Sequence, residues 1–350
     1  MRLVFVLLPI ATFQCAEIAG ITDLPDAGPG DVAPYDGPPP QTTCTNGKTV
    51  LSTNLDAMNV AASGGRFYAQ TAEGLLSCTV SAPCVNPTLF FNLTASDKLF
   101  SYTVGAQLAY TLQSGANSGS VHARALDGTG DQALGQNLAY PAYVALSGSR
   151  TFWVDDASTS TSNQTPAVLH CIGCGSGDMQ WITGLNATHA AFADANDVYV
   201  LADDGTSSLT YGIYGCSVGS ACGGSPRVVA KGLDTYALGV ASDGTNVFVA
   251  RSDQTDLVAI DKVGTAKPLA LQVSINAIAV DAAKGELYFV TYGGLVAVVK
   301  TDGSATPSVV SNCDTNFGDI DSIAIDATNV YILMTSIDTI GATILAIPRP

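Results

Sequence analysis

The stretch RVVAKGLDTYALGVASDGTNVFVA (residues 227–250) contains the pattern that decides the fold of this 350-residue chain. A short strand of small apolar residues leads into the turn DGTN (243–246) and then into the aromatic-containing strand VFVA. Glycine and asparagine in such a turn accept the positive φ angles that tight hairpins need. Two further strands follow, DLVAIDK (256–262) and KPLALQV (267–273), and Pro268 suits an outer edge strand. The unit is therefore predicted to be a four-stranded antiparallel sheet.

The same pattern occurs seven times along the chain, each copy with one aromatic residue in its second strand. These marker residues are Tyr68, Phe100, Phe152, Tyr199, Phe248, Tyr288 and Tyr331. Their mean spacing is about 44 residues, although the first two intervals, 32 and 52 residues, depart from it. A period of this length, without a helical apolar stripe, is typical of propeller blades rather than of solenoid repeats.

The two ends of the repeat region complement each other. The last copy supplies three strands and stops at ATILAIPRP (342–350), whereas KTVLSTN (48–54) stands alone before the first copy. A ring of blades keeps two exposed sheet edges unless such a strand completes the last blade. The sequence therefore predicts an all-β fold, a seven-bladed β-propeller of four-stranded blades over residues 44–350. We expect residues 48–54 to lie beside residues 344–347.

The residues before the propeller indicate export. Residues 1–15 hold Arg2, an apolar run that is too short to cross a bilayer as a helix, and Cys15. Cys15 favours a bacterial lipoprotein signal in which this cysteine is acylated, although Gln14 stands where a small residue is expected. Ordinary secretion is the alternative, and a cytosolic chain is the least favoured. Residues 16–43, rich in Pro, Gly and Asp, predict a disordered tether. The expected location is the outer membrane, the periplasm or the medium.

The charge balance limits the partners. The chain has 14 basic and 30 acidic residues and a net charge of −16. Nucleic acid and anionic membranes reward positive charge, so neither is expected as a partner, and membrane contact is expected only through a lipid anchor. We expect a monomer that binds an envelope protein or a carbohydrate.

Nine cysteines are present, and six of them form close pairs at turns between the third and fourth strands. The pairs are Cys78–Cys84, Cys171–Cys174 and Cys216–Cys222. In an exported protein such pairs are disulfides. Zinc or a redox dithiol at CIGC (171–174) is the alternative, but it lacks further ligands and a helical context. With Cys15 set aside, Cys44 and Cys313 remain as a pair, although the expected strand map places them nearer opposite faces.

Two segments carry a resemblance to a known family. IAIDATNVY (323–331) and YGCSVGSACGGSPRVVA (214–230) resemble repeats of bacterial secreted and lipoprotein propellers, distant relatives of the YWTD propellers of lipoprotein receptors. The resemblance covers roughly residues 45–350. It departs after the tyrosine, where Ile332 and Leu333 replace the Trp-Thr of the family. Most members of this group have no assigned activity, so the resemblance implies the fold and no substrate.

One face of the expected ring is acidic. The connections from the fourth to the first strand and from the second to the third share this face, which we name the loop face; the other turns form the turn face. Thirteen acidic residues fall on the loop face against Lys231 and Arg251, whereas the turn face is balanced. The candidate ligand residues on the loop face are Asp155, Asp156, Asp203, Asp204, Asp234, Tyr236, His189, Asp319 and Asp321. The plain alternative is that these aspartates only favour loops and keep the protein soluble.

A calcium ion is the one cofactor that these residues suggest. Asp155-Asp156 and Asp203-Asp204 hold matching places in consecutive blades, so a Ca²⁺ ion could bridge them.

Catalytic motifs are scarce. Of the three histidines, His122 and His170 fall on third strands, where structural roles are expected, and only His189 can reach the axis. No serine–histidine–aspartate motif or phosphate loop is recognisable. We therefore predict a non-enzymatic cell-envelope binding or scaffold module that presents its acidic loop face to a protein, carbohydrate or cation. The alternative is a lactonase- or lyase-like propeller enzyme with a metal at the axis; a structural protein without a ligand is a third possibility.

Overall fold

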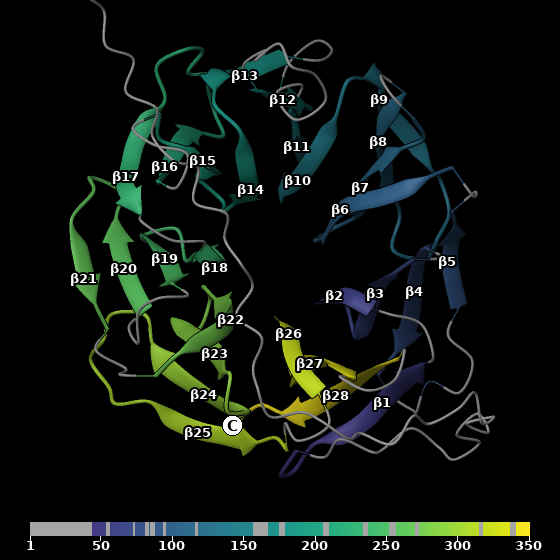
Figure 1. Cartoon of the computed structure of the whole chain (residues 1–350), viewed down its shortest axis with the longest axis vertical. Coiled ribbons are helices and arrows are strands. Elements are labelled where there is room, and N and C mark those ends of the chain that lie inside the picture. Colours follow the sequence, from purple (N-terminus) through teal and green to yellow (C-terminus); the bar gives the residue numbers. More distant parts are fainter. Residues whose placement is uncertain are drawn as a thin grey trace, which may run out of the picture. The chain divides into compact units, whose positions relative to one another are not determined.

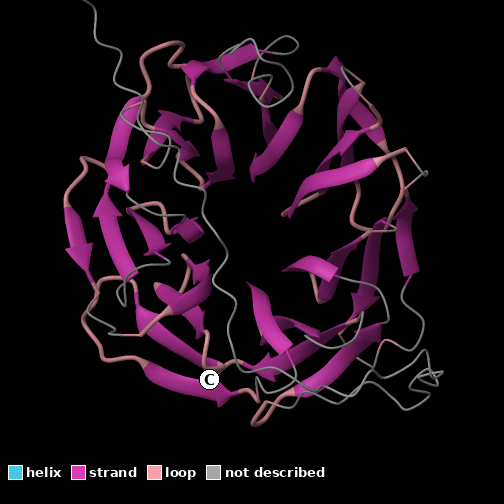
Figure 2. Cartoon of the chain, viewed as in Figure 1, coloured by secondary structure: helices cyan, strands magenta, loops and turns pink. Residues whose placement is uncertain are grey.

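The computed structural model describes most of the chain from residue 44 to the C-terminus. The described residues are 44–53, 57–72, 74–80, 84, 88–93, 96–115, 118–156, 167–174, 179–205, 210–233, 237–251, 257–269, 273–314, 318–336 and 341–350. All regular secondary structure among them is β-strand (Figure 2). Within these ranges no helix is long and apolar enough to span a bilayer. The expected signal, with Cys15, and the expected tether lie outside the described residues.

Seven four-stranded antiparallel sheets surround a central axis (Figure 1). Blade 1 is β2 (Ala57–Ser63), β3 (Arg66–Thr71), β4 (Gly74–Thr79) and β5 (Thr88–Asn92); blade 2 is β6 (Lys98–Val104), β7 (Leu108–Gln113), β8 (Gly119–Arg124) and β9 (Gln132–Leu138). Blade 3 is β10 (Pro141–Ser147), β11 (Arg150–Asp155), β12 (Ala167–Ile172) and β13 (Met179–Leu185); blade 4 is β14 (Thr188–Ala193), β15 (Asp197–Asp203), β16 (Tyr211–Ser217) and β17 (Arg227–Leu233). Blade 5 is β18 (Ala237–Ser242), β19 (Asn246–Arg251), β20 (Leu257–Asp261) and β21 (Ala266–Pro268); blade 6 is β22 (Ile275–Asp281), β23 (Glu286–Thr291), β24 (Leu295–Lys300) and β25 (Ser308–Asn312). Blade 7 is β26 (Gly318–Ile325), β27 (Asn329–Ser336), β28 (Ala342–Pro348) and β1 (Lys48–Thr53).

Strand β1 closes the ring as the sequence predicts. It pairs antiparallel with β28, with Lys48 opposite Ala346 and Thr53 opposite Ala342. Val50 and Leu51 of this strand are each only 2% exposed. Each innermost strand contacts the innermost strand of the next blade, and β26 contacts β2, so the ring is continuous. The predicted seven-bladed propeller with a completing N-terminal strand is confirmed.

The repeat in blade 2 is placed differently from the prediction. Phe100 was expected on the second strand, but it lies on β6, the innermost strand. The marker position of blade 2 is held by Ala109 on β7, which pairs with Thr103 as Phe152 pairs with Ala145 in blade 3. With Ala109 in its place, the first two intervals become 41 and 43 residues instead of 32 and 52. The error arose because Asp97-Lys98 resembles the hairpin turn between a first and a second strand. In the structure this turn lies before the first strand of the blade.

The four cysteine pairs are disulfides. Cys78–Cys84, Cys171–Cys174 and Cys216–Cys222 each join a third strand to the turn that follows it. Cys44–Cys313 joins residues 269 positions apart. The predicted pairing is confirmed, but the expectation that Cys44 and Cys313 lie nearer opposite faces is wrong.

Blade twist explains this correction. Adjacent strands rotate by about 20–25°, so over three steps the outermost strand turns from the axial direction towards the rim. The end of β25 therefore meets the segment before β1 at the rim (Figure 1). Thr45 N donates to Asn312 O at 2.8 Å beside the disulfide. A similar rim contact joins blades 3 and 4, where Thr183 N donates to Gly223 O.

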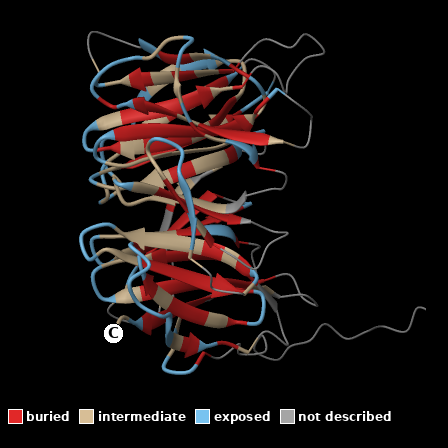
Figure 3. Cartoon of the chain, turned by 90° about the vertical axis from the view of Figure 1, so that its left-hand side faces the viewer, coloured by how far each residue is buried: buried red, intermediate tan, exposed pale blue. Residues whose placement is uncertain are grey.

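The core lies between the blades and is built on the aromatic residues of the second strands. Tyr68, Tyr199, Tyr288 and Tyr331 are fully buried. In Figure 3 buried residues follow the strands, and exposed residues gather in the turns. The turn DATNVY (326–331) has a physical role: Asp326 accepts the backbone N–H groups of its own turn and also the Tyr331 hydroxyl at 2.7 Å. One carboxylate therefore fixes both the hairpin and the core aromatic.

Candidate functional site: the axial mouth of the loop face

All seven innermost strands bulge at the same place, near the end that faces the loop face. In each blade the register between the first and second strands skips one residue of the first strand. We name these skipped residues the bulge ring: Met58, Phe100, Ala142, His189, Leu238, Asn276 and Asp321. β-Bulges re-aim side chains and are over-represented beside functional sites. The same bulge thus occurs in all seven blades, and a different type of residue can occupy it in each.

A pocket of about 510 Å³ lies within this ring. Its walls come from the innermost strands β2, β6, β18, β22 and β26, with Gln70 from β3. Apolar side chains such as Met58, Phe100 and Ile323 alternate with the polar side chains of Asn59, Asp321 and Ser322. The volume of this pocket lies within the range of small-ligand sites.

A hydrogen-bond network fixes the wall between blades 1 and 7. Ser322 Oγ donates to Asn59 Oδ1 at 2.6 Å, and the Asn59 carbonyl accepts the Tyr102 hydroxyl at 3.1 Å. Gln70 is 6% exposed, and its Nε2 donates to the Leu99 carbonyl at 2.8 Å. The polar groups of the pocket are therefore held in place before any ligand arrives.

Asp321 supplies the charge of the pocket. It is exposed, and its Oδ2 accepts the Thr335 hydroxyl. The lining residues include no lysine or arginine. The described pocket therefore favours a ligand with a positive charge.

His189 is the second predicted candidate that the structure places on the bulge ring. Its Nε2 lies 2.7 Å from Asp203 Oδ1, and the Tyr211 ring meets the imidazole edge-on at 4.6 Å between centroids. The His189 side chain is 30% exposed. Asp203, itself a predicted candidate, therefore orients His189.

The remaining described aspartates of the loop face serve the backbone. Asp155 accepts N–H groups from Ala139 and Tyr140, in the connection between blades 2 and 3. Asp156 is fully buried and accepts the N–H and the hydroxyl of Thr188 in blade 4. These two carboxylates join neighbouring blades instead of facing solvent.

Asp204 is also turned inward. It is 9% exposed and accepts the Thr210 hydroxyl and the Gly232 N–H. In the part of the chain that the structure describes, no three His, Cys, Asp or Glu side chains converge as metal ligands. Asp155, Asp156, Asp203 and Asp204 therefore do not fit the predicted bridging Ca²⁺ site.

Three predicted candidates cannot be placed at the pocket. Asp234 and Tyr236 lie outside the described residues, and Asp319 is described only as a backbone position of β26, opposite Thr335. Conversely, sequence reasoning missed Met58, Asn59 and Phe100. Their position in the repeat could have identified them, because each of the seven copies has its bulge near the start of its innermost strand.

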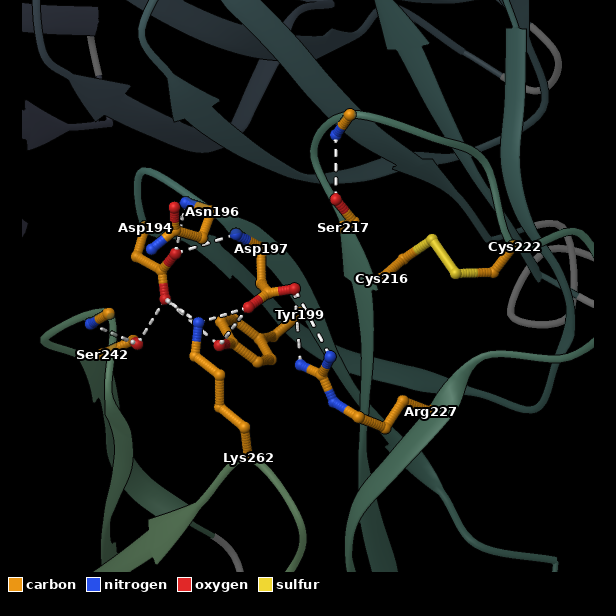
Figure 4. Close-up of polar contacts among 12 residues, drawn as sticks. Asp194, Asn196, Asp197, Tyr199, Cys216, Ser217, Cys222, Arg227, Ser242 and Lys262 are labelled. Atoms are coloured by element: carbon orange, nitrogen blue, oxygen red, sulfur yellow. Dashed lines mark hydrogen bonds and ion pairs between the residues drawn. A yellow bond between two sulfur atoms is a disulfide. The ribbon is translucent and has the colours of Figure 1, made fainter.

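The turn face is organised differently, by ion pairs between blades (Figure 4). Lys262 of blade 5 contacts Asp197 and lies 3.9 Å from Asp194, both in the first turn of blade 4. Ser242 also donates to Asp194, at 2.7 Å. Burial raises the pKa of Asp194, but the hydrogen bonds from Ser242 and the turn backbone, together with Lys262, outweigh it and hold that pKa below its ordinary value.

A second cluster on the turn face joins blades 6 and 7. Arg349 follows β28, and its side chain is 3% exposed. It forms ion pairs with Asp281 and Glu286, and its Nε donates to the Tyr288 hydroxyl at 3.0 Å. The guanidinium also stacks over the Tyr288 ring at 4.9 Å. One buried cation thus links the end of the chain to the neighbouring blade.

Comparisons with known proteins agree with the fold. No family model matches the sequence, and no curated protein matches it. The structure of U3-55K is similar with a TM-score of 0.61 and 9% identity, over 86% of this chain and 98% of that one. The propeller domain of the Trilobed protease from Pyrococcus furiosus, which has an open velcro topology, gives 0.60 and 8% identity, over 83% and 95%.

A third similar structure is the extracellular domain of the one-component system BT4673 from B. thetaiotaomicron. It gives a TM-score of 0.53 and 15% identity, over 85% of this chain but only 39% of that chain. At these identities the likeness shows a propeller and no function, since one fold hosts many functions. The resemblance to YWTD-type repeats and to bacterial lipoproteins stays a prediction.

Proposed function

We propose that this chain is an exported binding module whose ligand enters the axial pocket at the loop face. The observation that supports this most is the pocket of about 510 Å³ inside the bulge ring. Its volume lies within the range of about 300–1,000 Å³ that ligand sites occupy. The alternative, an enzyme with an axial metal, has no described cluster of metal ligands in its favour.

The lining favours a basic peptide segment of an envelope protein. A lysine or arginine side chain has an apolar stem and a charged end. Met58, which is 57% exposed, offers an adaptable thioether for the stem, and Asp321 offers a carboxylate for the charge. Asn59 adds a fixed amide beside them.

The disulfides support the proposed location. Four disulfides are typical of proteins that fold in oxidising compartments. Anchoring through Cys15 and the tether formed by residues 16–43 completes the proposal, because it would hold the loop face within reach of an envelope partner. Mass spectrometry of the mature N-terminus tests the acylation of Cys15.

Fluorescence anisotropy with labelled hexapeptides tests the binding site. We expect a lysine-rich peptide to bind the wild-type protein at low salt and a glutamate-rich peptide not to bind. Loss of a charge-assisted contact is worth about 1.5–3 kcal/mol, so Asp321→Asn should weaken binding by about tenfold or more. Asp302→Asn is the matched control, because Asp302 is an exposed aspartate of the turn face. Equal affinity of Asp321→Asn and wild type would contradict the proposed site.

A further inference from the structure

A second constellation lies far from the axis, on the outer half of blade 2. Ser120 and His122 stand two residues apart on β8, so their side chains share one side of the strand. Asp131 immediately precedes β9. His122 Nε2 lies 3.0 Å from Ser120 Oγ, and His122 Nδ1 lies 3.3 Å from Asp131 Oδ2. Hydroxyl, imidazole and carboxylate are thus connected in the order that nucleophilic catalysis requires.

Neighbouring groups fix the imidazole. The Tyr110 ring stacks on His122 at 5.0 Å with planes 12° apart, and Phe91 of blade 1 stacks on Tyr110 at 4.5 Å. The Tyr110 hydroxyl donates to Asp131 Oδ1 at 2.7 Å. Burial, and then this hydrogen bond, raise the pKa of Tyr110, so its hydroxyl keeps its proton and acts as the donor. Tyr110 therefore holds both the ring plane of His122 and the carboxylate of Asp131.

These contacts decide the tautomer of His122. An ionised carboxylate only accepts hydrogen bonds, so the proton of the neutral imidazole belongs on Nδ1, which faces Asp131. Nε2 then offers its lone pair to the Ser120 hydroxyl. Strand β9 also bulges opposite Ser120, since its register jumps from Leu138 to Gln136. Bulges occur frequently beside active sites.

Blade 3 shows which part of this arrangement is structural. His170 stands at the matching place on β12 and stacks on Trp153 at 5.4 Å with planes 9° apart. Stacking on the aromatic residue of the second strand is therefore a repeated packing feature. The residue two positions before His170 is Val168, so blade 3 has no hydroxyl where blade 2 has Ser120.

We propose that Ser120, His122 and Asp131 form a nucleophilic triad that hydrolyses small reactive acyl esters. Ser120 is half-buried and Asp131 is exposed, so a small ester can reach the triad from solvent. This activity is separate from ligand binding at the axial pocket.

The reaction has two balanced steps. Ser120 Oγ bonds to the carbonyl carbon while its proton moves to His122 Nε2; the ester C–O bond breaks, and the leaving alcohol takes that proton. Water then attacks the acyl-serine, gives a proton to His122 Nε2, and the bond to Ser120 Oγ breaks as that oxygen takes the proton back. The sum is ester plus water to acid plus alcohol. Asp131 stabilises the imidazolium in both steps.

Hydrolysis of p-nitrophenyl acetate tests the proposal with four variants of the full chain. Ser120→Ala should return the rate to that of buffer, and Asp131→Asn should lower it strongly. General acid–base catalysis contributes about 10²–10⁴-fold. His122→Phe should also abolish activity while keeping an aromatic ring to stack on Tyr110. His170→Phe is the matched control and should hydrolyse at the wild-type rate.

A covalent probe separates serine catalysis from simple imidazole catalysis. A fluorophosphonate should attach one equivalent of label to Ser120 in the wild-type protein, and none in Ser120→Ala or His122→Phe. Thermal unfolding of each variant checks that it is folded. A wild-type rate no greater than that of Ser120→Ala, or labelling that spares Ser120, overturns the proposal. Peptide binding at Asp321 is unaffected by either result, so the two proposals can fail independently.

Discussion

The two faces of the ring use the same residue, aspartate, in opposite ways. On the turn face, Asp194, Asp197 and Asp281 meet cations that come from the next blade. On the loop face, Asp155 accepts the Tyr140 N–H of the connection from blade 2, and Asp156 accepts the N–H and the hydroxyl of Thr188 in blade 4. The first arrangement pairs each carboxylate with a cation, whereas the second satisfies each carboxylate with neutral hydrogen-bond donors. Aspartate thus joins neighbouring blades on both faces, through ion pairs on one face and through neutral donors on the other.

The largest expected effect concerns the buried cation of the turn face. Arg349→Met removes the partner of Asp281 and Glu286 and keeps much of the aliphatic volume. Breaking a buried pair costs about 3–5 kcal/mol, and because both acids are partly exposed we expect about 2–3 kcal/mol in the free energy of unfolding by urea. Lys300→Met is the control, since Lys300 pairs with the same Glu286 but is 46% exposed. If the two variants are equally stable, Arg349 does not stabilise the contact between blades 6 and 7.

The next effect concerns the loop face. Asp156→Ala leaves the N–H and the hydroxyl of Thr188 without their acceptor inside the protein. A buried group without a partner costs about 1–3 kcal/mol, so we expect a loss of about 2 kcal/mol in urea unfolding. Asp156→Asn keeps one acceptor oxygen and should lose less. Full stability of Asp156→Ala would show that loop-face carboxylates do not join blades.

The smallest effect is the dependence of stability on pH. Burial raises the pKa of Asp326, but the Tyr331 hydroxyl and the backbone N–H groups of the turn outweigh it and hold that pKa below the ordinary value of 3.8. Since its folded pKa is lower than its unfolded pKa, the stabilisation is complete above about pH 4 and is lost as the pH falls through the folded pKa. Asp281 and Glu286 are shifted in the same direction against the raising effect of burial, chiefly by hydrogen bonds from Arg349 and Lys300 respectively.

Unfolding free energies measured between pH 5 and pH 2.5 check this prediction. Asp326→Asn should be less stable than wild type at pH 5 and should show a shallower decline in acid. A decline of the same steepness in both proteins would mean that other groups control acid unfolding.

The sequence predicts the ring because a hairpin turn, a nearby aromatic residue and a regular spacing recur along the chain. Phe100 shows where such reasoning fails, since an aromatic residue on an innermost strand looks like one on a second strand when a turn precedes both. The predicted Cys44–Cys313 pairing is correct. Its position at the rim could not be predicted, because it depends on the twist of the outer strands, which no local sequence pattern shows.

The candidate site was less accessible to prediction. His189 and Asp321 were found because they are charged or titratable residues near the expected mouth. Met58 and Asn59 line the pocket with Asp321 because β2 bulges at Met58, and a one-residue register shift is not visible in the composition. Likewise, Ser120 and Asp131 meet at His122 only because strand β9 returns beside β8.

Closure by β1 has a consequence for the order of events during translation. β28 emerges roughly 290 residues after its partner β1. At about 5–20 residues per second, β1 waits for roughly 15–60 s with Val50 and Leu51 in water. The nascent chain therefore exposes an unpaired apolar strand for most of its synthesis, and we expect a chaperone to bind it. A circular permutant that begins at β26 and joins residue 350 to residue 44 would deliver blade 7 whole and remove that wait.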